Sequence, residues 1–287
     1  MVSAPRRIAG LSQIASRYDL ILCDVWGVVH NGVAAHPAAI DALTRFRAGG
    51  GRVVLVTNAP RQRRSVFRQL AELGAQPESY DAVVTSGDVT RDLIAAAPKR
   101  LFHLGPHKDR NLFEGLDREL VGEEDAEAVV CSGLFDDRTE TPADYAPMLA
   151  RFAARGLPFL CANPDIVVEM GDRLLYCAGA LGRDYAALGG RTLVAGKPHP
   201  PIYEAAVAEA AKIAGRNIAR ARILAIGDGA ATDIAGAAAF GVDAVFVAAG
   251  IHVGEYGGGD EPDEAALARF LSAAGLGPAW WIPRLQW

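Results

Sequence analysis

The sequence lacks the features that mark nucleic-acid-binding and membrane proteins. Its 287 residues carry 29 Lys and Arg against 34 Asp and Glu, a net charge of -5, and the longest group of cations is three arginines between residues 61 and 64. Without a basic patch, we expect neither nucleic acid nor an anionic membrane surface as a partner. No apolar run approaches the roughly 20 residues that a membrane-spanning helix needs, so no membrane insertion is expected.

Cysteine is scarce and is not spaced as metal ligands are. The chain has four cysteines, Cys23, Cys131, Cys161 and Cys177. Three of them end or interrupt apolar runs, where a thiol packs as a small hydrophobic group. The first 15 residues also lack the continuous apolar segment of a secretion signal. These observations predict buried thiols in a reducing, cytoplasmic setting.

The chain is instead rich in apolar residues, which make up 51% of it and fall into alternating strand-like and helix-like segments. Short apolar runs at residues 20–23, 52–56, 222–226 and 242–248 predict an α/β fold with a doubly wound parallel sheet. The alternation is less regular in the middle of the chain. We therefore expect a core domain formed by residues 1–88 and 192–287, with residues 89–191 inserted as a smaller α/β domain.

Two further stretches are interpreted from their composition. The acidic stretch 119–127 is interpreted as a surface loop. The C-terminal tail carries Trp280, Trp281 and Trp287, and such a group more often covers a core edge or a subunit contact than it binds a ligand.

Polar side chains follow four of the predicted strands. They are Asp24, Thr57 with Asn58, Lys197, which lies one loop beyond a further predicted strand at residues 191–195, and Asp228 with Asp233. Each of them alone is typical of a turn or a helix cap. In a doubly wound sheet, however, the carboxyl ends of the strands converge on one crevice. We therefore expect these side chains to form a single site.

Such a set suits phosphoryl transfer through a carboxylate. An ionised Asp24 would attack the phosphorus, while Lys197 and Mg²⁺ offset the charge on the phosphoryl oxygens. Mg²⁺ prefers hard oxygen ligands and retains some of its waters. Asp24, Asp228 and the main-chain carbonyl of Trp26 would supply these ligands.

The motifs resemble those of the haloacid dehalogenase-like hydrolases, specifically the class IIA branch of nitrophenyl-phosphatase-like, nucleotide-phosphatase-like and pyridoxal-phosphatase-like proteins. Residues 24–28 are similar to the first family motif, 56–58 to the second, 196–198 to the third and 227–234 to the fourth. The resemblance implies a Rossmann-like core with an inserted C2-type cap that sets substrate specificity. It also implies Mg²⁺-dependent hydrolysis of a small phosphorylated metabolite, of the sugar phosphate or nucleotide class, through an aspartyl-phosphate.

The same resemblance implies a role for each residue of the site. Asp24 would be the nucleophile, and Thr57 and Asn58 would bind the phosphate. Lys197 would contact both the nucleophile and the phosphate. Asp228 would bind the metal, with Asp233 in support of it. By the same analogy, the cap turn with Asn163 and Asp165 lies near the substrate. Cap-mediated dimers occur in the family, so a homodimer is left open, with the aromatic tail as a second candidate surface.

One residue departs from the family pattern. Phosphatases of this family carry a second aspartate two residues after the nucleophile, which protonates the leaving oxygen and later activates water. This sequence has Trp26 at that position, and an indole cannot transfer the proton. Loss of a general acid-base costs on the order of a hundredfold to ten-thousandfold in rate. The metal role is retained, because in the family this position binds Mg²⁺ through its carbonyl.

Three interpretations of Trp26 stay open. The chain is a slow phosphatase, or one restricted to good leaving groups, with His30 as a candidate substitute base, although a loop histidine is more often structural. Alternatively, it binds a phosphorylated metabolite or another partner without turnover. A metal-independent dehalogenase-like enzyme is the third interpretation, disfavoured by the acidic fourth motif and the C2-like cap. Two further loop histidines, His199 and His252, are left out of the predicted site.

Overall fold

The computed structural model describes residues 5–170, 173–257 and 261–287. The chain divides into two compact units. Unit 1 comprises Met1–Thr57, Phe67–Val84 and Lys197–Trp287, and unit 2 comprises Asn58–Val66 and Thr85–Gly196. Within the described ranges, no helix is both long and apolar enough to cross a membrane. Each unit is built on a parallel sheet with helices, so the predicted α/β class is confirmed.

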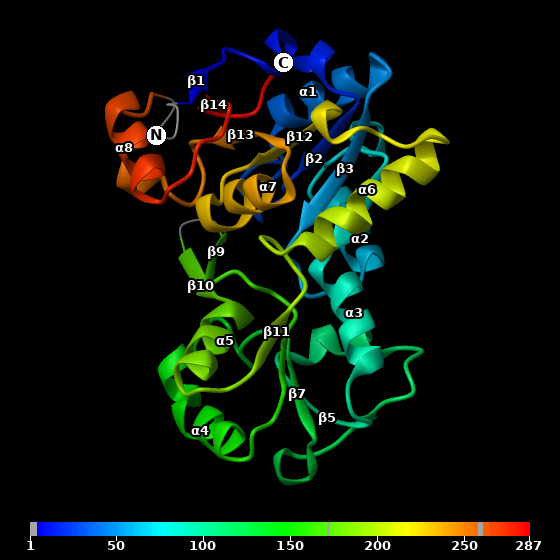
Figure 1. The fold of residues 1–287 in the computed structure, drawn as a ribbon, viewed down its shortest axis with the longest axis vertical. Helices are drawn as coiled ribbons and strands as arrows, with labels where there is room; N and C mark the ends of the chain where they lie inside the picture. Colours follow the sequence, from blue (N-terminus) through cyan, green and yellow to red (C-terminus); the bar gives the residue numbers. More distant parts are fainter. Residues whose placement is uncertain (1–4, 171–172, 258–260) are drawn as a thin grey trace. The chain divides into compact units, whose positions relative to one another are not determined.

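Unit 1 contains a seven-stranded sheet (Figure 1). In spatial order its strands are β1 (Arg6–Arg7), β14 (Trp280–Ile282), β13 (Asp243–Val247), β12 (Ile223–Gly227), β2 (Leu20–Cys23), β3 (Arg52–Thr57) and β4 (Ala82–Thr85). Neighbouring strands from β1 through β3 pair in parallel. Every residue of β2 and β12 is buried, as expected for central parallel strands covered on both faces.

The strand order reverses between β2 and β12. From β2 the chain continues to β3 and β4 on one side, and from β12 it continues to β13 and β14 on the other. The helices around this sheet are α1 (Pro37–Ala48), α2 (Arg63–Glu72), α6 (Pro200–Ala214), α7 (Ala235–Phe240) and α8 (Glu264–Ala273). In open α/β sheets, a crevice for ligands forms where the order reverses, beyond the carboxyl ends of the strands. The reversal therefore marks where a site is expected in unit 1.

Unit 2 has its own five-stranded parallel sheet and a separate hairpin. The sheet order is β11 (Thr192–Val194), β8 (Phe159–Cys161), β7 (Ala128–Cys131), β5 (Arg100–Leu104) and β6 (Glu119–Leu120). The antiparallel hairpin is formed by β9 (Val167–Met170) and β10 (Arg173–Tyr176). The helices are α3 (Ser86–Ala96), α4 (Ala146–Ala154) and α5 (Ala178–Ala187).

Strand β7 shows why this second sheet is buried on both faces. Val129 and Cys131 belong to one apolar cluster, while Ala128 and Val130 belong to another. Successive side chains of a strand point to opposite faces, so an uninterrupted apolar run supplies both layers. All four cysteines of the chain are buried free thiols, as predicted.

Two of the stretches interpreted from their composition contain short strands. The stretch 119–127 contains the short edge strand β6, which pairs with β5, as well as turns. In the tail, Trp280 and Trp281 lie inside β14, between β13 and β1, and are nearly fully buried. The guanidinium of Arg17 lies 4.9 Å from the ring centre of Trp280. These tryptophans are thus part of the sheet itself, a role that an aromatic run without period-two alternation does not reveal.

Candidate active site

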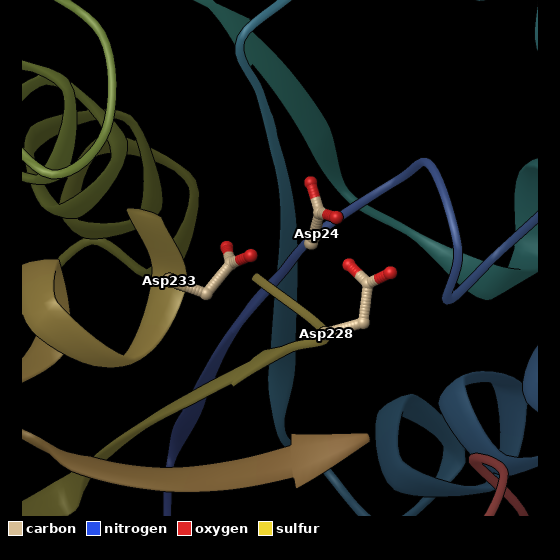
Figure 2. A group of neighbouring side chains, drawn as sticks. All are labelled: Asp24, Asp228 and Asp233. Carbon is tan, nitrogen blue, oxygen red and sulfur yellow. The ribbon is translucent and has the colours of Figure 1, made fainter. Parts of the chain in front are cut away.

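The two strands at the reversal each end in an aspartate. The amide of Asp24 continues the β2–β12 ladder by donating to the carbonyl of Ile226 at 2.8 Å, and Asp228 directly follows β12. A third aspartate, Asp233, lies in the π-helical turn Ala230–Ile234 that precedes α7. Carboxylate oxygens of these three buried residues lie within 4.8 Å of one another. Figure 2 shows their carboxylates gathered around one point.

A single lysine connects two of the three carboxylates. Lys197 Nζ lies 2.5 Å from Asp24 Oδ1 and 2.8 Å from Asp233 Oδ1, and only 3% of the residue is exposed. Charges removed from water in this way must be paired to be tolerated. The cluster holds three carboxylates against one ammonium, so its formal charge is negative whenever the acids are ionised.

Burial and the excess of negative charge raise the pKa of two of the three aspartates. Burial raises the pKa of Asp24 well above its usual value, and the charges of Asp233 and Asp228 raise it further, while Lys197 lowers it. Burial, followed by the charge of Asp233, also raises the pKa of Asp228 to about 7. A further positive charge at this point would relieve the repulsion. Hard carboxylate oxygens are the donors that Mg²⁺ prefers, so these residues fit a divalent metal.

Two glycines make room for Asp228. A Cβ atom at Gly27 would lie 2.1 Å from Asp228 Oδ2, and one at Gly250 would lie 2.0 Å from the same oxygen. Gly27 also has a φ of +78°, which side chains other than glycine rarely adopt. The amide of Ile251 donates to Asp228 Oδ2 at 2.9 Å and so fixes the orientation of the carboxylate.

Asp233 is held by its own turn. Its Oδ1 accepts a hydrogen bond from Lys197 Nζ, and its Oδ2 accepts one from the amide of Gly229 at 3.1 Å. The hydroxyl of Tyr203 on α6 donates to the carbonyl of Asp233 at 3.3 Å. Both oxygens of Asp233 are thus engaged by the protein, which suits a residue that orients Lys197. The sequence does not reveal Tyr203, because its partner Asp233 lies 30 residues away. Nor does it reveal Ile251, because that residue contacts Asp228 through its main-chain amide.

The remaining predicted residues are divided between the two units. Thr57 ends β3 in unit 1, next to β2, and is buried. In unit 2, Asn58 donates through Nδ2 to Asp165 Oδ1 at 2.8 Å, and the amide of Asp165 donates to Asn163 Oδ1 at 3.1 Å. The structure therefore brings together Asp24, Lys197, Asp228 and Asp233 in unit 1, and separately joins Asn58, Asn163 and Asp165 in unit 2.

The Trp26 side chain is packed against its own loop. Its ring centre lies 4.8 Å from that of His30 in an edge-to-face arrangement. A Cβ atom at Gly32 would lie 2.6 Å from the indole. His30 is fully buried, and its Nδ1 accepts a hydrogen bond from the Gly32 amide at 3.0 Å. In this arrangement the ring of His30 supports the indole and the turn.

His252, which was left out of the predicted site, also has a structural contact. Its Nε2 accepts a hydrogen bond from the amide of Ala230 at 3.2 Å, where the π-helical turn begins. Its ring packs against Phe270 of α8. His252 thus supports the turn that carries Asp233.

Comparison with known proteins decides the family. A model of the haloacid dehalogenase-like hydrolases matches residues 21–119, and a second, HAD-hydrolase-like model matches residues 194–269. The crystal structure of a haloacid dehalogenase-like hydrolase from Brucella suis 1330 is 50% identical, with 98% of this chain and 99% of that chain covered and a TM-score of 0.88. The chain belongs to the haloacid dehalogenase-like hydrolase family.

Other relatives are more distant. D-glycerol 3-phosphate phosphatase of Mycobacterium tuberculosis is 30% identical over 247 residues, covering 84% of this chain, which spans only 66% of that relative's length. A glycerol phosphate phosphatase from the same species, solved with magnesium, is 29% identical, covers 83% and 70% of the two chains and has a TM-score of 0.64. A 4-nitrophenylphosphatase from Thermotoga maritima, 22% identical over 94% and 96% of the chains with a TM-score of 0.70, shares the fold. The predicted family and the hydrolase class are confirmed.

Proposed function

We propose that this hydrolase is a phosphatase that cleaves small phosphomonoesters through an aspartyl-phosphate on Asp24. The observation that carries the proposal is the buried ammonium of Lys197, which contacts both Asp24 and Asp233 within a group of three carboxylates. A nucleophilic carboxylate needs to be ionised, and a cation at 2.5 Å favours that form. The phosphatases among the relatives support the same reaction.

In this mechanism, an oxygen of Asp24 forms a bond to phosphorus while the bond from phosphorus to the leaving oxygen breaks. Lys197 offsets charge on Asp24 and on the phosphoryl group, and Thr57 and Asn58 bind the phosphoryl oxygens. Water then attacks the phosphorus of the aspartyl-phosphate, which releases inorganic phosphate and regenerates the Asp24 carboxylate. No carboxylate stands at the position of Trp26 to protonate the leaving oxygen, so the proton comes from solvent.

We further propose Mg²⁺ as the cofactor, held by Asp24, Asp228 and the Trp26 carbonyl, with Asp233 behind them. Lys197 engages one oxygen of Asp24, and Ile251 engages one oxygen of Asp228. Each carboxylate therefore has a second oxygen to offer. Bound Mg²⁺ would neutralise charge on these carboxylates and on the phosphoryl oxygens.

The substrate and setting follow from the same proposal. We assign residues 89–191, which lie within unit 2, to a C2-type cap that selects the substrate, with Asn163 and Asp165 near it. The substrate is a small phosphorylated metabolite of the sugar phosphate or nucleotide class, and the relatives that act on glycerol phosphate support a polyol phosphate in particular. The buried thiols support a cytoplasmic location.

The test is phosphate release from esters with good and poor leaving groups, measured with and without Mg²⁺. We compare wild type with Asp24→Asn and Trp26→Asp, and use Asp41→Asn, on the exposed face of α1, as a matched control. Asp24→Asn should abolish release, and the control should not change it. Trp26→Asp should accelerate alkyl phosphates far more than 4-nitrophenyl phosphate, by up to about a hundredfold to ten-thousandfold, because a general acid matters most for poor leaving groups.

Because the indole of Trp26 cannot transfer a proton, one alternative is a protein that binds a phosphorylated metabolite without turnover. If wild type is inert with every ester while Trp26→Asp is active, that alternative replaces the phosphatase. Halide release from a 2-haloacid without metal would instead identify a dehalogenase-like enzyme.

A further inference from the structure

The carboxyl edge of the five-stranded sheet in unit 2 carries a second group of polar residues. Strand β5 is followed by Gly105 and then by the 3-10 segment His107–Phe113, which contains Asp109. Its neighbour β7 is followed by Ser132. Helix α3 packs beside this segment, since Arg91 Nη1 donates to the carbonyl of Leu112 at 2.6 Å. Ligands of α/β folds are commonly bound at this edge of a parallel sheet.

Several buried polar atoms in this part of unit 2 have no hydrogen-bond partner. Among the described residues they are Ser86 Oγ and Thr90 Oγ1 on α3, and Asp109 Oδ1 and Asn111 Oδ1 in the 3-10 segment. Asp109 is only 2% exposed, and Ser86 and Thr90 are fully buried. Buried polar groups are nearly always paired, and an unpaired group costs about 1 to 3 kcal/mol. Of these atoms, Asp109 Oδ1 belongs to the segment that follows β5 at the carboxyl edge of the sheet, and its lack of a partner indicates that something polar can bind there.

Next to Asp109 lies a serine–histidine pair. His103 Nε2 lies 2.9 Å from Ser132 Oγ, and the Ser132 hydroxyl is close enough to Asp109 to lower its pKa. A Cβ atom at Gly105 would lie 2.1 Å from Ser132 Oγ, so a glycine is required where these groups meet. Burial lowers the pKa of His103 to about 4, which leaves its ring neutral at physiological pH.

The charges around Asp109 restrict the ligand. The positive charges of Arg61 and Lys108 both act on Asp109, and they disfavour a cationic ligand. The carboxylate of Asp109 and the nearby charge of Asp137 disfavour an anionic one. Carboxylate and amide oxygens accept hydrogen bonds, while serine and threonine hydroxyls both donate and accept. An uncharged group with neighbouring O–H donors suits Asp109 Oδ1 and the Ser132 hydroxyl.

We propose that this edge of unit 2 binds neighbouring hydroxyl groups of a polyol, with Asp109 accepting from one hydroxyl and the Ser132–His103 pair bonding another. The hydroxyls have two sources: the leaving group of a phosphorylated substrate, or a free polyol. The first source rests on the proposed phosphatase function, and the second does not.

The experiment has two arms and uses the full chain. In the first, kcat/KM is measured for glycerol 3-phosphate and for 4-nitrophenyl phosphate, which has no hydroxyl groups. In the second, binding of glycerol and of sorbitol is measured by calorimetry. Both arms compare wild type with Asp109→Asn and Ser132→Ala. The control is Asp117→Asn, an exposed acid-to-amide change in the same unit, where the side chain is 85% exposed.

For a leaving-group site, Asp109→Asn lowers kcat/KM for glycerol 3-phosphate by roughly ten- to hundredfold, the usual effect of a hydrogen bond to a charged group, and changes that for 4-nitrophenyl phosphate less than about twofold. For a free-polyol site, the same variant weakens calorimetric binding by a similar factor. Ser132→Ala should act in the same direction in either case.

Two results overturn the proposal. Equal losses with both substrates would show that Asp109 and Ser132 only support the fold. Unchanged kinetics together with polyol binding that is absent, or that both variants leave unaltered, would show that no hydroxyl is bound there. If no ester is hydrolysed at all, the phosphatase proposal fails by itself, and the calorimetric arm alone decides the polyol site.

Discussion

Asp109→Asn should stabilise the protein near neutral pH, although it removes a charged residue. Burial raises the pKa of Asp109 from 3.8 to about 6, against the lowering effect of the charges of Arg61 and Lys108. The folded chain therefore retains a proton that the unfolded chain releases between about pH 4 and pH 6. Because the folded state binds more protons in that window, the free energy of unfolding falls as pH rises through it. Asparagine is neutral at every pH and avoids this loss.

The size of the effect follows from the shift. A shift of about two pKa units, at 1.36 kcal/mol each, lowers the free energy of unfolding by about 3 kcal/mol above pH 7. At pH 4.5 only about 1 kcal/mol of this is lost. The stability difference between Asp109→Asn and wild type should thus increase by about 2 kcal/mol from pH 4.5 to pH 7.5. Other effects of the substitution, such as an unpaired amide, are the same at both pH values and cancel.

Urea unfolding at the two pH values measures this difference, with Asp117→Asn, an exposed acid-to-amide change in the same unit, as the matched control. A difference that is independent of pH would contradict the assigned burial of the carboxylate. A variant that loses stability as pH rises would show that Asp109 is instead stabilised by Arg61. Stability gained here at the cost of polyol binding would be typical of a functional site.

Three further outcomes concern the aspartate cluster. Lys197→Met leaves two buried carboxylates without their cation. We expect the free energy of unfolding, measured with urea, to fall by about 3 to 5 kcal/mol and phosphate release to stop. The exposed control Lys212→Met should change neither. Gly27→Ala places a methyl group on Asp228 and should abolish activity while far-ultraviolet circular dichroism stays native; retained activity would show that the loop can move aside. Mg²⁺ at a hundred times its Kd should stabilise wild type by about 2.7 kcal/mol, which is measured as a rise in melting temperature. Asp228→Asn should remove most of that rise, and an unchanged rise would show that the ion binds elsewhere.

Much of the fold and of the acidic cluster was predictable, because both depend on local patterns. The apolar run Leu20–Cys23 predicts a buried strand, and the residue after it, Asp24, must then lie at the edge of the sheet. The same reasoning places Asp228. Lys197 was harder to place, since its loop separates it from β11, and only the order of the motifs indicated that it joins the acids.

The contacts that complete the site leave little trace in the sequence. Ile251 acts through its amide, which every residue except proline possesses, and Tyr203 contacts the carbonyl of Asp233, which lies 30 residues away in sequence. The unpaired oxygen of Asp109 follows from tertiary packing, because Asp109 stands in a stretch with the charge density of an ordinary surface turn. For the same reason, β6 and β14 were interpreted as loop and tail, since two or three residues are too few to show a strand period.

Trp26 is the residue on which sequence and structure together say more than either alone. The sequence shows that a proton donor is replaced, and the structure shows that the replacing indole packs against its own loop. Gly32, with a φ of +82°, closes on one side of the ring, and buried His30 lies against it. A histidine that supports the indole and uses Nδ1 to hold the turn is poorly placed to act as a substitute acid. The rate of such an enzyme would then depend on how readily its substrate's leaving group departs without protonation.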